Sequence, residues 1–237
     1  FLLEANPRAS RTAPFVSKAI GIQLAKLGAL VMSGVMLENL NLPNRSDNKS
    51  YFSVKEAVFP FSKFPEVDVL LGPEMKSTGE VMGFGKTFGE AYFKAQRAAG
   101  VILPKKGNVF ISVRDHDKEP ICEVASELIS MGFKVFATSG TYNHLIQNTI
   151  ECSKINKVKD GHPHIVDMIK NNEVHLIINT TEGARSIKDS FSIRKEAQNH
   201  KISLTTTVSG AKAFCKAIKF IDDFGAQDLK QRHDSIS

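Results

Sequence analysis

The 237-residue chain has few cysteines and no long apolar run, and both features exclude classes of protein to which it could otherwise belong. Its three cysteines, Cys122, Cys152 and Cys215, are an odd number without metal-site spacing, so we interpret them as reduced thiols rather than a disulfide framework. No run approaches the roughly 18 apolar residues of a membrane span, and the apolar N-terminus is too short for a signal peptide. These absences predict a cytoplasmic protein without a membrane partner.

Aromatic residues are not interleaved with the basic ones as stacking platforms for nucleic acid would be, although the net charge is +6. Most of the basic excess lies in 1–106, and small anionic ligands explain it better than a nucleic acid does. A hydrophobic content of 42% with 24% charged residues indicates a folded protein with room for one or two domains.

Two familiar motifs are incomplete in this chain. The run from Gly83 to Thr87 resembles a phosphate-binding P-loop, but Glu80 stands where that motif has its first glycine. His162 and His164 flank Pro163 without further metal ligands at the expected sequence spacing, so we interpret the pair as solvated.

The periodicity of apolar residues predicts two unlike regions. Before a break at Pro104–Gly107, two short helices are expected within 14–34, a strand at 51–61, a loop-rich stretch at 72–83 and a helix at 87–99. After the break, strands are expected at 108–113, 133–137, 174–178 and 202–206, a further unit at 150–158, and helices at 117–131, 142–148, 165–171, 187–199 and 211–221. The break divides the chain into predicted domains 1–105 and 106–237.

Short strands alternating with helices favour an α/β fold in the second region, a Rossmann-like parallel sheet flanked by helices. Ligands of such sheets bind beyond the carboxyl ends of the strands. Those ends carry Thr138–Thr141, Asn179–Gly183 and Thr205–Thr207, and Lys118 and Lys157 follow two further strands. A single Thr or Ser at a helix start is usually a cap, but the repetition favours a phosphate or nucleotide pocket.

The first twelve residues combine an apolar run with Glu4, Asn6, Arg8 and Arg11. Carboxylate and amide oxygens suit Mg²⁺, and guanidinium groups bind phosphate oxygens through paired hydrogen bonds. Because this ligand cluster opens the chain directly, we expect the sequence to begin within a fold that extends upstream.

Three blocks in order carry a family resemblance: 4–12 with 14–18, then 51–56, then 71–83. Together they resemble the C-terminal part of the large subunit of carbamoyl-phosphate synthetases. That resemblance implies the end of the second ATP-grasp synthetase unit, as an incomplete remnant, followed by a methylglyoxal-synthase-like allosteric domain. It covers nearly the whole chain.

The resemblance implies an ATP-dependent carbon–nitrogen ligase that makes carbamoyl phosphate from bicarbonate and glutamine-derived ammonia, for arginine or pyrimidine biosynthesis. Its partners would be the rest of the large subunit and a glutaminase small subunit, and its cofactor Mg²⁺ or Mn²⁺ with ATP, with K⁺ as a further possibility. The chain alone is expected to be inactive, because the adenine pocket and phosphate-gripping loop would lie upstream.

Family positions give roles to individual residues. Glu4 and Asn6 would be metal ligands, and Arg8 and Arg11 would bind the transferring phosphoryl group or its acceptor. Glu56 and Thr206 would contact the activator ornithine, with Thr205 in place of a family Asp. The expected pocket for IMP and UMP consists of Lys118, Thr138, Thr141, Lys157, Asn179 and Thr181.

Two alternatives use the same pocket. One is a stand-alone nucleotide-binding regulatory module without catalysis. The other is a methylglyoxal synthase, a lyase acting on dihydroxyacetone phosphate, although 161–164 reads Gly-His-Pro-His where that family has Gly-Gly-Asp-Gln with its catalytic carboxylate.

Overall fold

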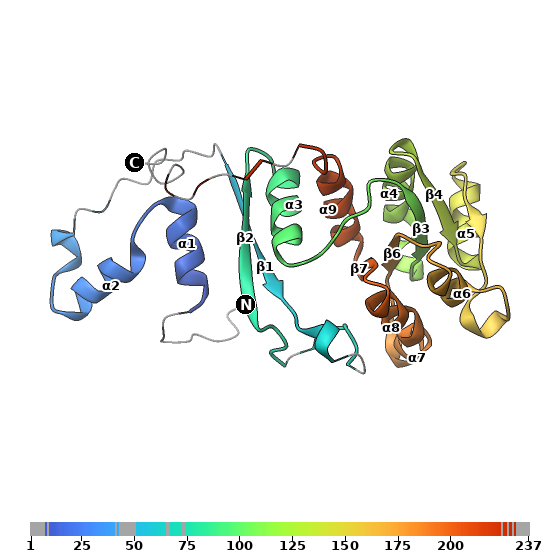
Figure 1. Ribbon diagram of the computed structural model, residues 1–237, viewed down its shortest axis with the longest axis horizontal. Helices are drawn as coiled ribbons and strands as arrows, with labels where there is room; N and C mark the ends of the chain where they lie inside the picture. Colours follow the sequence, from blue (N-terminus) through green and yellow to red (C-terminus); the bar gives the residue numbers. More distant parts are fainter. Residues whose placement is uncertain are drawn as a thin grey trace.

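A computed structural model describes residues 8, 10–40, 42, 51–64, 67–72, 74–223, 225–226, 228 and 230. Helices α1 and α2, a hairpin of β1 and β2, and helix α3 precede a larger α/β unit, and the elements follow one another along the long axis of Figure 1. The α/β unit has the predicted architecture, a parallel sheet with helices on both faces.

Five parallel strands form the main sheet in the order β5-β4-β3-β6-β7. The strands are β3 (Gly107–Ser112), β4 (Phe133–Ala137), β5 (Ser153–Lys154), β6 (Leu176–Asn179) and β7 (Ser203–Thr205). The chain starts at the central strand β3, runs outward to β5 and then crosses to β6 on the other side. The strand order therefore reverses between β3 and β6, where open α/β sheets bind their ligands.

Alternate residues of the central strands bury opposite faces of the sheet. Val109, Ile111 and Ile178 belong to one hydrophobic cluster, whereas Phe110 and Ile177 belong to the other. All five side chains are fully buried. Because helices cover both faces of the sheet, the sequences of these strands are continuously apolar and do not alternate between polar and apolar residues.

The helices of the sheet domain divide between those two faces. The first face packs residues of α4 (Lys118–Ser130), α5 (Ser139–Gln147) and α9 (Val208–Ile218), and the second packs those of α6 (Ile165–Lys170) and α8 (Phe191–Asn199). The sequence predicted a single helix over 187–199. The structure instead has α7 (Gly183–Asp189) and α8, which meet at Ser190. Helix α5 also starts three residues before the predicted Tyr142.

An antiparallel hairpin precedes the sheet domain, formed by β1 (Phe52–Val58) and β2 (Gly79–Gly85). The loop-rich expectation for 72–83 is wrong for its last five residues, which belong to β2. Glycines 79, 83 and 85 hid the strand pattern, and Gly83 has a packing reason: a Cβ there would overlap the backbone of α3 (Phe88–Ala98) at Ala91 and Ala95. Helix α3 in turn packs against α9, which joins the hairpin to the sheet domain (Figure 1).

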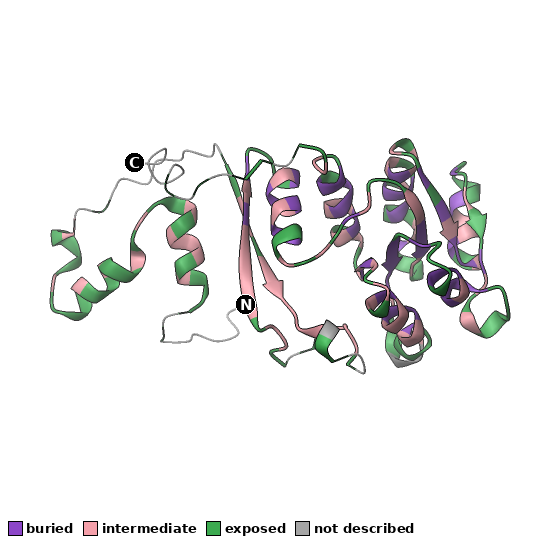
Figure 2. Ribbon diagram, in the orientation of Figure 1, coloured by how far each residue is buried: buried purple, intermediate pink, exposed green. Residues whose placement is uncertain are grey.

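Helices α1 (Thr12–Ile20) and α2 (Leu24–Met32) confirm the predicted helix pair broken at Gly21, which has φ +73°. Neither contains a buried residue, and Figure 2 shows burial concentrated in the sheet domain and α3. No single helix among the described residues is long and apolar enough to cross a membrane. Helices α1 and α2 are long and apolar enough only when taken together, and the chain bends by 116° at the break between them.

Candidate functional site

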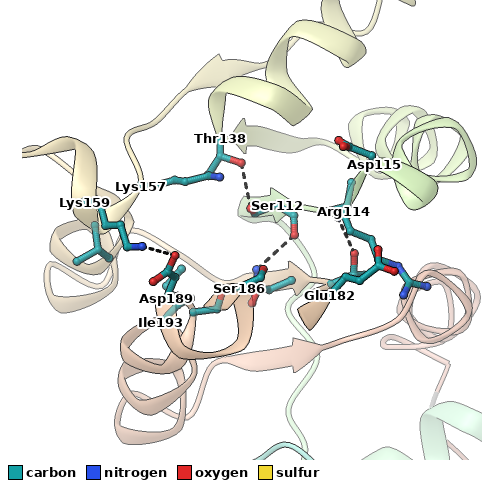
Figure 3. A pocket seen from close by; sticks show the side chains of 15 residues that line it. Ser112, Arg114, Asp115, Thr138, Lys157, Lys159, Glu182, Ser186, Asp189 and Ile193 are labelled. Atoms are coloured by element: carbon teal, nitrogen blue, oxygen red, sulfur yellow. Dashed lines mark hydrogen bonds and ion pairs between the residues drawn. The ribbon is translucent and has the colours of Figure 1, made fainter. Parts of the chain in front are cut away.

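A cavity of about 510 Å³ lies at the carboxyl ends of β3, β4 and β6, where the strand order reverses. Figure 3 shows its lining side chains, which come from the strand ends, from the segment after β5 and from helices α7 and α8. The lining residues are Ser112, Val113, Arg114, Asp115, Thr138, Lys157, Val158, Lys159, Asn179, Thr180, Glu182, Ser186, Asp189, Ser190 and Ile193. The predicted pocket at the strand ends therefore exists as a cavity.

Hydrogen bonds hold the three strand ends together beneath the cavity. Ser112 Oγ lies 3.0 Å from Thr138 Oγ1, and Asn179 Nδ2 donates to the backbone oxygen of Ser112 at 3.3 Å (Figure 3). Thr180 Oγ1 accepts the backbone N–H of Arg114 at 3.1 Å. These short polar side chains fix the floor of the cavity and leave its upper part to longer, charged groups.

Asn179 has an unpaired acceptor in this floor. Its side-chain oxygen Oδ1 is buried and has no hydrogen-bond partner among the described residues, although the residue as a whole is only 2% exposed. A buried amide oxygen without a partner costs free energy, about 1–3 kcal/mol. A ligand that donates a hydrogen bond in the cavity would remove that cost.

The N-terminus of α5 lies beside the floor and combines two sources of positive potential. Thr138 precedes the helix, but its hydroxyl bonds to Ser112 instead of capping α5, so the cap interpretation is wrong for this residue. A Cβ at Gly140 would lie 3.4 Å from Lys118 Nζ, so the ammonium of Lys118 sits over the first turn. Backbone N–H groups at a helix start and a nearby ammonium together favour an anion.

Most charged groups around the cavity are already paired. Lys118 Nζ contacts Asp115 at 2.7 Å and lowers the pKa of that carboxyl, while Lys159 pairs with Asp189 across the opening (Figure 3). Arg114 Nε pairs with Asp117 at 2.8 Å. Lys157 forms no ion pair with any described residue, and it lines the cavity beside Thr138. Its ammonium is therefore available to a ligand.

The six residues predicted for the nucleotide pocket fall into two groups. Thr138, Lys157 and Asn179 line the cavity. Lys118 reaches the adjacent helix start, Thr141 Oγ1 accepts the backbone N–H of Val113 at 3.2 Å, and Thr181 follows the lining residue Thr180. Thr141 is 1% exposed, so the structure gives it the role of joining α5 to the end of β3.

Sequence reasoning missed the segment Ser112–Asp115 and the residues of α7. The segment directly follows the first strand of the domain, so the rule applied to later strands would have found it. Ser186 and Asp189 lie three residues apart, which places them on one face of α7. This three-residue spacing indicates a shared helix face only when the helix boundary at Ser190 is known, and the sequence did not reveal that boundary.

The two residues assigned to ornithine lie on different elements. Glu56 is a half-buried carboxylate of β1; burial raises its pKa, which a hydrogen bond with Gln96 of α3 partly offsets. Burial and the charge of Glu56 raise the pKa of Tyr92 to about 12. Thr206 follows β7 and precedes α9, and the neighbouring Thr205 bonds to the backbone of Thr207.

The residues assigned to phosphoryl transfer are only partly described. Glu4 and Asn6 lie outside the described residues, and Arg8 is exposed. Arg11 Nη2 donates to Met75 Sδ at 3.3 Å and to Ser77 Oγ at 3.5 Å, and its Nε lies 4.0 Å from Glu80 Oε2. Arg11 is thus tied to the start of β2, a connection that the sequence did not predict.

Comparisons with known proteins show which families this chain resembles. Residues 120–206 match the family described as MGS-like domain. The carbamoyl phosphate synthase large chain of Pseudomonas syringae pv. tomato is 54% identical over 98% of this chain. The large chains of Pseudomonas aeruginosa and Xanthomonas axonopodis pv. citri are 53% and 50% identical over 100% of this chain. In each case the match covers 22% of the relative's own length.

The chain spans about a fifth of the length of these relatives and matches their C-terminal part. The solved structure of ForH covers 55% of this chain at a TM-score of 0.35 and 16% identity, a similarity too weak to indicate a shared fold. The sequence similarity confirms the resemblance: over nearly its whole length the chain is similar to the C-terminal part of carbamoyl phosphate synthase large chains, and its parallel sheet is consistent with the MGS-like domain matched by 120–206.

Proposed function

We propose that residues 106–237 form the regulatory nucleotide domain of a carbamoyl-phosphate synthase, with UMP and IMP as ligands of the cavity. The observation that carries the proposal is a convergence at the strand-order reversal. Lys157, the α5 N-terminus with Lys118, and Asn179 Oδ1 meet there, and among the described residues Lys157 has no ion-pair partner and Asn179 Oδ1 no hydrogen-bond partner. A nucleoside monophosphate offers matching groups, a dianionic phosphate and hydrogen-bond donors on its base or ribose.

The phosphate would lie at the start of α5, between Lys118 and Lys157. There the first backbone N–H groups of the helix and two ammonium groups would share its charge. The sugar and base would extend along the cavity toward α7 and α8, where Ser186 and Ser190 supply hydroxyl groups and Ile193 supplies an apolar surface.

Residues 1–105 would then be the end of the second ATP-grasp unit, which phosphorylates carbamate in the complete large chain. Arg8 and Arg11 would bind the transferring phosphoryl group, and Glu4 and Asn6 would hold Mg²⁺ or Mn²⁺. The complete enzyme would take ammonia from a glutaminase small subunit. The large chains of Pseudomonas syringae pv. tomato and Pseudomonas aeruginosa are 54% and 53% identical to this chain over the matched length, and this similarity supports the assignment.

Glu56 would bind the activator ornithine. Its carboxylate is partly removed from water beside Tyr92 and Gln96, which disfavours its charge. A cationic amine would compensate that charge in the same place. Ornithine titrated into the protein by calorimetry should therefore bind in the wild type and bind more weakly to Glu56→Gln.

The lyase alternative finds less support. Methylglyoxal synthases need a catalytic carboxylate in the loop that here reads Gly161-His162-Pro163-His164. The carboxylate of Asp167, beyond this loop, is engaged by both histidines and by the backbone N–H of His164. A regulatory pocket therefore accounts for the cavity better than catalysis on dihydroxyacetone phosphate.

Calorimetric titration of the chain with UMP and IMP tests the proposal. We expect binding in the wild type, at least tenfold weaker binding in Lys157→Ala, and unchanged binding in Lys154→Ala, an exposed lysine of β5 outside the cavity lining. Uridine, which lacks the phosphate, should bind much more weakly than UMP. Absence of binding to a protein with a normal cooperative unfolding transition would contradict the proposal.

A further inference from the structure

A second group of ligand-type side chains lies outside the cavity, at the start of α6. His162, His164 and Asp167 each offer one ligand atom, and these three atoms lie within 4.8 Å of one another. Sequence spacing indicated no further ligand for the histidine pair, but Asp167 contacts both rings. The sequence hid this partner because it lies one helical turn beyond His164.

Nitrogen atoms of both rings converge on one carboxylate oxygen. His162 Nδ1 lies 2.7 Å and His164 Nδ1 3.1 Å from Asp167 Oδ2, and the two ring centroids are 4.3 Å apart. The backbone N–H of His164 donates to the same oxygen at 2.9 Å. The three ligand-type atoms therefore lie close together at the start of α6.

One of these contacts brings two hydrogen-bond acceptors close together. The backbone N–H of Asp167 donates to His164 Nδ1 at 3.3 Å, so that this nitrogen carries no proton in the hydrogen-bonded arrangement. The same nitrogen also lies 3.1 Å from Asp167 Oδ2. Two acceptors at this distance repel unless a positive charge lies between them, which either a proton or a metal ion can supply.

Exposure of the three side chains suits a metal ion that arrives from solvent. The His162 side chain is 77% exposed and that of Asp167 30%, whereas His164 is 9% exposed and fixed at the helix start. A tetrahedral zinc site with bonds of about 2.0–2.1 Å separates neighbouring ligand atoms by about 3.3 Å. The observed separations of 2.7 and 3.1 Å need only a small movement, which the exposed His162 permits.

The geometry points to a site for one divalent transition-metal ion, of the Zn²⁺ or Co²⁺ class, bound by His162 Nδ1, His164 Nδ1 and Asp167 Oδ2. Two imidazoles and one carboxylate are a donor set typical of such ions, and water would complete the coordination. This site is separate from the proposed nucleotide pocket and holds whether or not that pocket binds UMP.

Titration of the metal-free protein with Co²⁺, followed by visible absorption, tests the inference. We expect one Co²⁺ per chain, with d–d bands of nitrogen and oxygen coordination and no near-ultraviolet thiolate band. The near-ultraviolet band must be checked because the chain has three free cysteines, whose thiolates also bind Co²⁺ tightly. Zn²⁺ added afterwards should displace Co²⁺ and abolish the bands.

Two variants and a control locate the ion. His162→Ala removes an exposed ligand and should weaken Co²⁺ binding at least tenfold without changing the unfolding midpoint. Asp167→Asn retains an oxygen to accept the His164 N–H but removes the charge, and it should weaken binding similarly. His116→Ala, at an exposed histidine of the segment before α4, should bind as the wild type does. Unchanged binding in His162→Ala, or no binding to the folded wild type, would overturn the inference.

Discussion

The carboxylate of Asp68 accepts two hydrogen bonds from the guanidinium of Arg194, Nε to Oδ1 at 2.8 Å and Nη2 to Oδ2 at 2.6 Å, across 126 residues of sequence. Arg194 Nη2 also donates to the backbone oxygen of Ile187 in α7 at 2.9 Å. The pair thus connects the segment before β2 to both helices that form one wall of the cavity. Gln198 of α8 donates to Phe61 O and adds a second connection.

Removal of Asp68 should destabilise the protein strongly. Asp68→Ala leaves the guanidinium of Arg194, which is 1% exposed, without its partner. The loss of one partner from such a buried pair costs about 3 kcal/mol. Urea unfolding measures the change, and Glu123→Gln, which breaks an exposed pair with Lys212, is the control with little expected effect.

The same pair gives the stability a pH dependence at low pH. Partial burial alone would raise the pKa of Asp68, but the hydrogen bonds and charge of Arg194 outweigh it and lower the pKa below the ordinary 3.8. The unfolded state therefore binds a proton first as the pH falls. The contribution of this pair to the unfolding free energy is complete above pH 3.8 and is lost as the pH falls below it. If the unfolding free energies of the wild type and Asp68→Ala fell equally with decreasing pH, the assignment would be contradicted.

Glu56→Gln should stabilise the protein at neutral pH. Burial raises the pKa of Glu56 above its ordinary 4.5, so the folded state holds the proton to higher pH than the unfolded state does. Stability from this group is complete below pH 4.5 and is lost as the pH rises through the raised pKa. Glutamine keeps the hydrogen bond with Gln96 without a charge.

The measurement is urea unfolding at a series of pH values. The stability of Glu56→Gln relative to the wild type should increase with pH above 4.5 and then level off. Glu38→Gln, at an exposed position, is the control and should show no such trend. A constant difference across the series would show that the Glu56 carboxyl is not perturbed.

Thr207→Ala should remove a true helix cap. Thr207 Oγ1 accepts the backbone N–H of Gly210 at 3.0 Å at the start of α9. Loss of such a cap costs about 1 kcal/mol. Ser209→Ala changes a hydroxyl in the first turn of the same helix and should alter the unfolding free energy by less than about 0.5 kcal/mol. Equal losses in both variants would contradict the cap.

The comparison between Thr207 and Thr138 shows what the sequence could and could not predict. Both threonines follow a strand and precede a helix, so local sequence gives them the same interpretation as caps. Only the structure shows that Thr138 bonds instead to Ser112 of the neighbouring strand. Apolar periodicity predicted the parallel sheet well because its strands bury both faces, and it placed Thr138, Lys157 and Asn179 at one cavity.

The errors share a physical cause, which is tertiary contact. β2 was missed because its glycines accommodate α3, a helix that follows it in sequence and covers it in space. Ser190 divides a predicted helix into α7 and α8, and Arg194 beyond that break pairs with a residue more than a hundred positions away. Neither contact leaves a local pattern that periodicity could detect.

Gly83→Ala should test the close packing of β2 against α3. A Cβ at Gly83 would overlap the backbone oxygen of Ala91 and the backbone nitrogen of Ala95, so the helix must move away from the strand. Overpacking of this kind costs about 1–3 kcal/mol, and the upper part of that range applies because backbone atoms must shift. Gly79→Ala, in the same strand, meets no atom within 4 Å and should leave the unfolding free energy nearly unchanged. Similar unfolding midpoints for the two variants would mean that α3 does not approach the strand as closely as the structure has it.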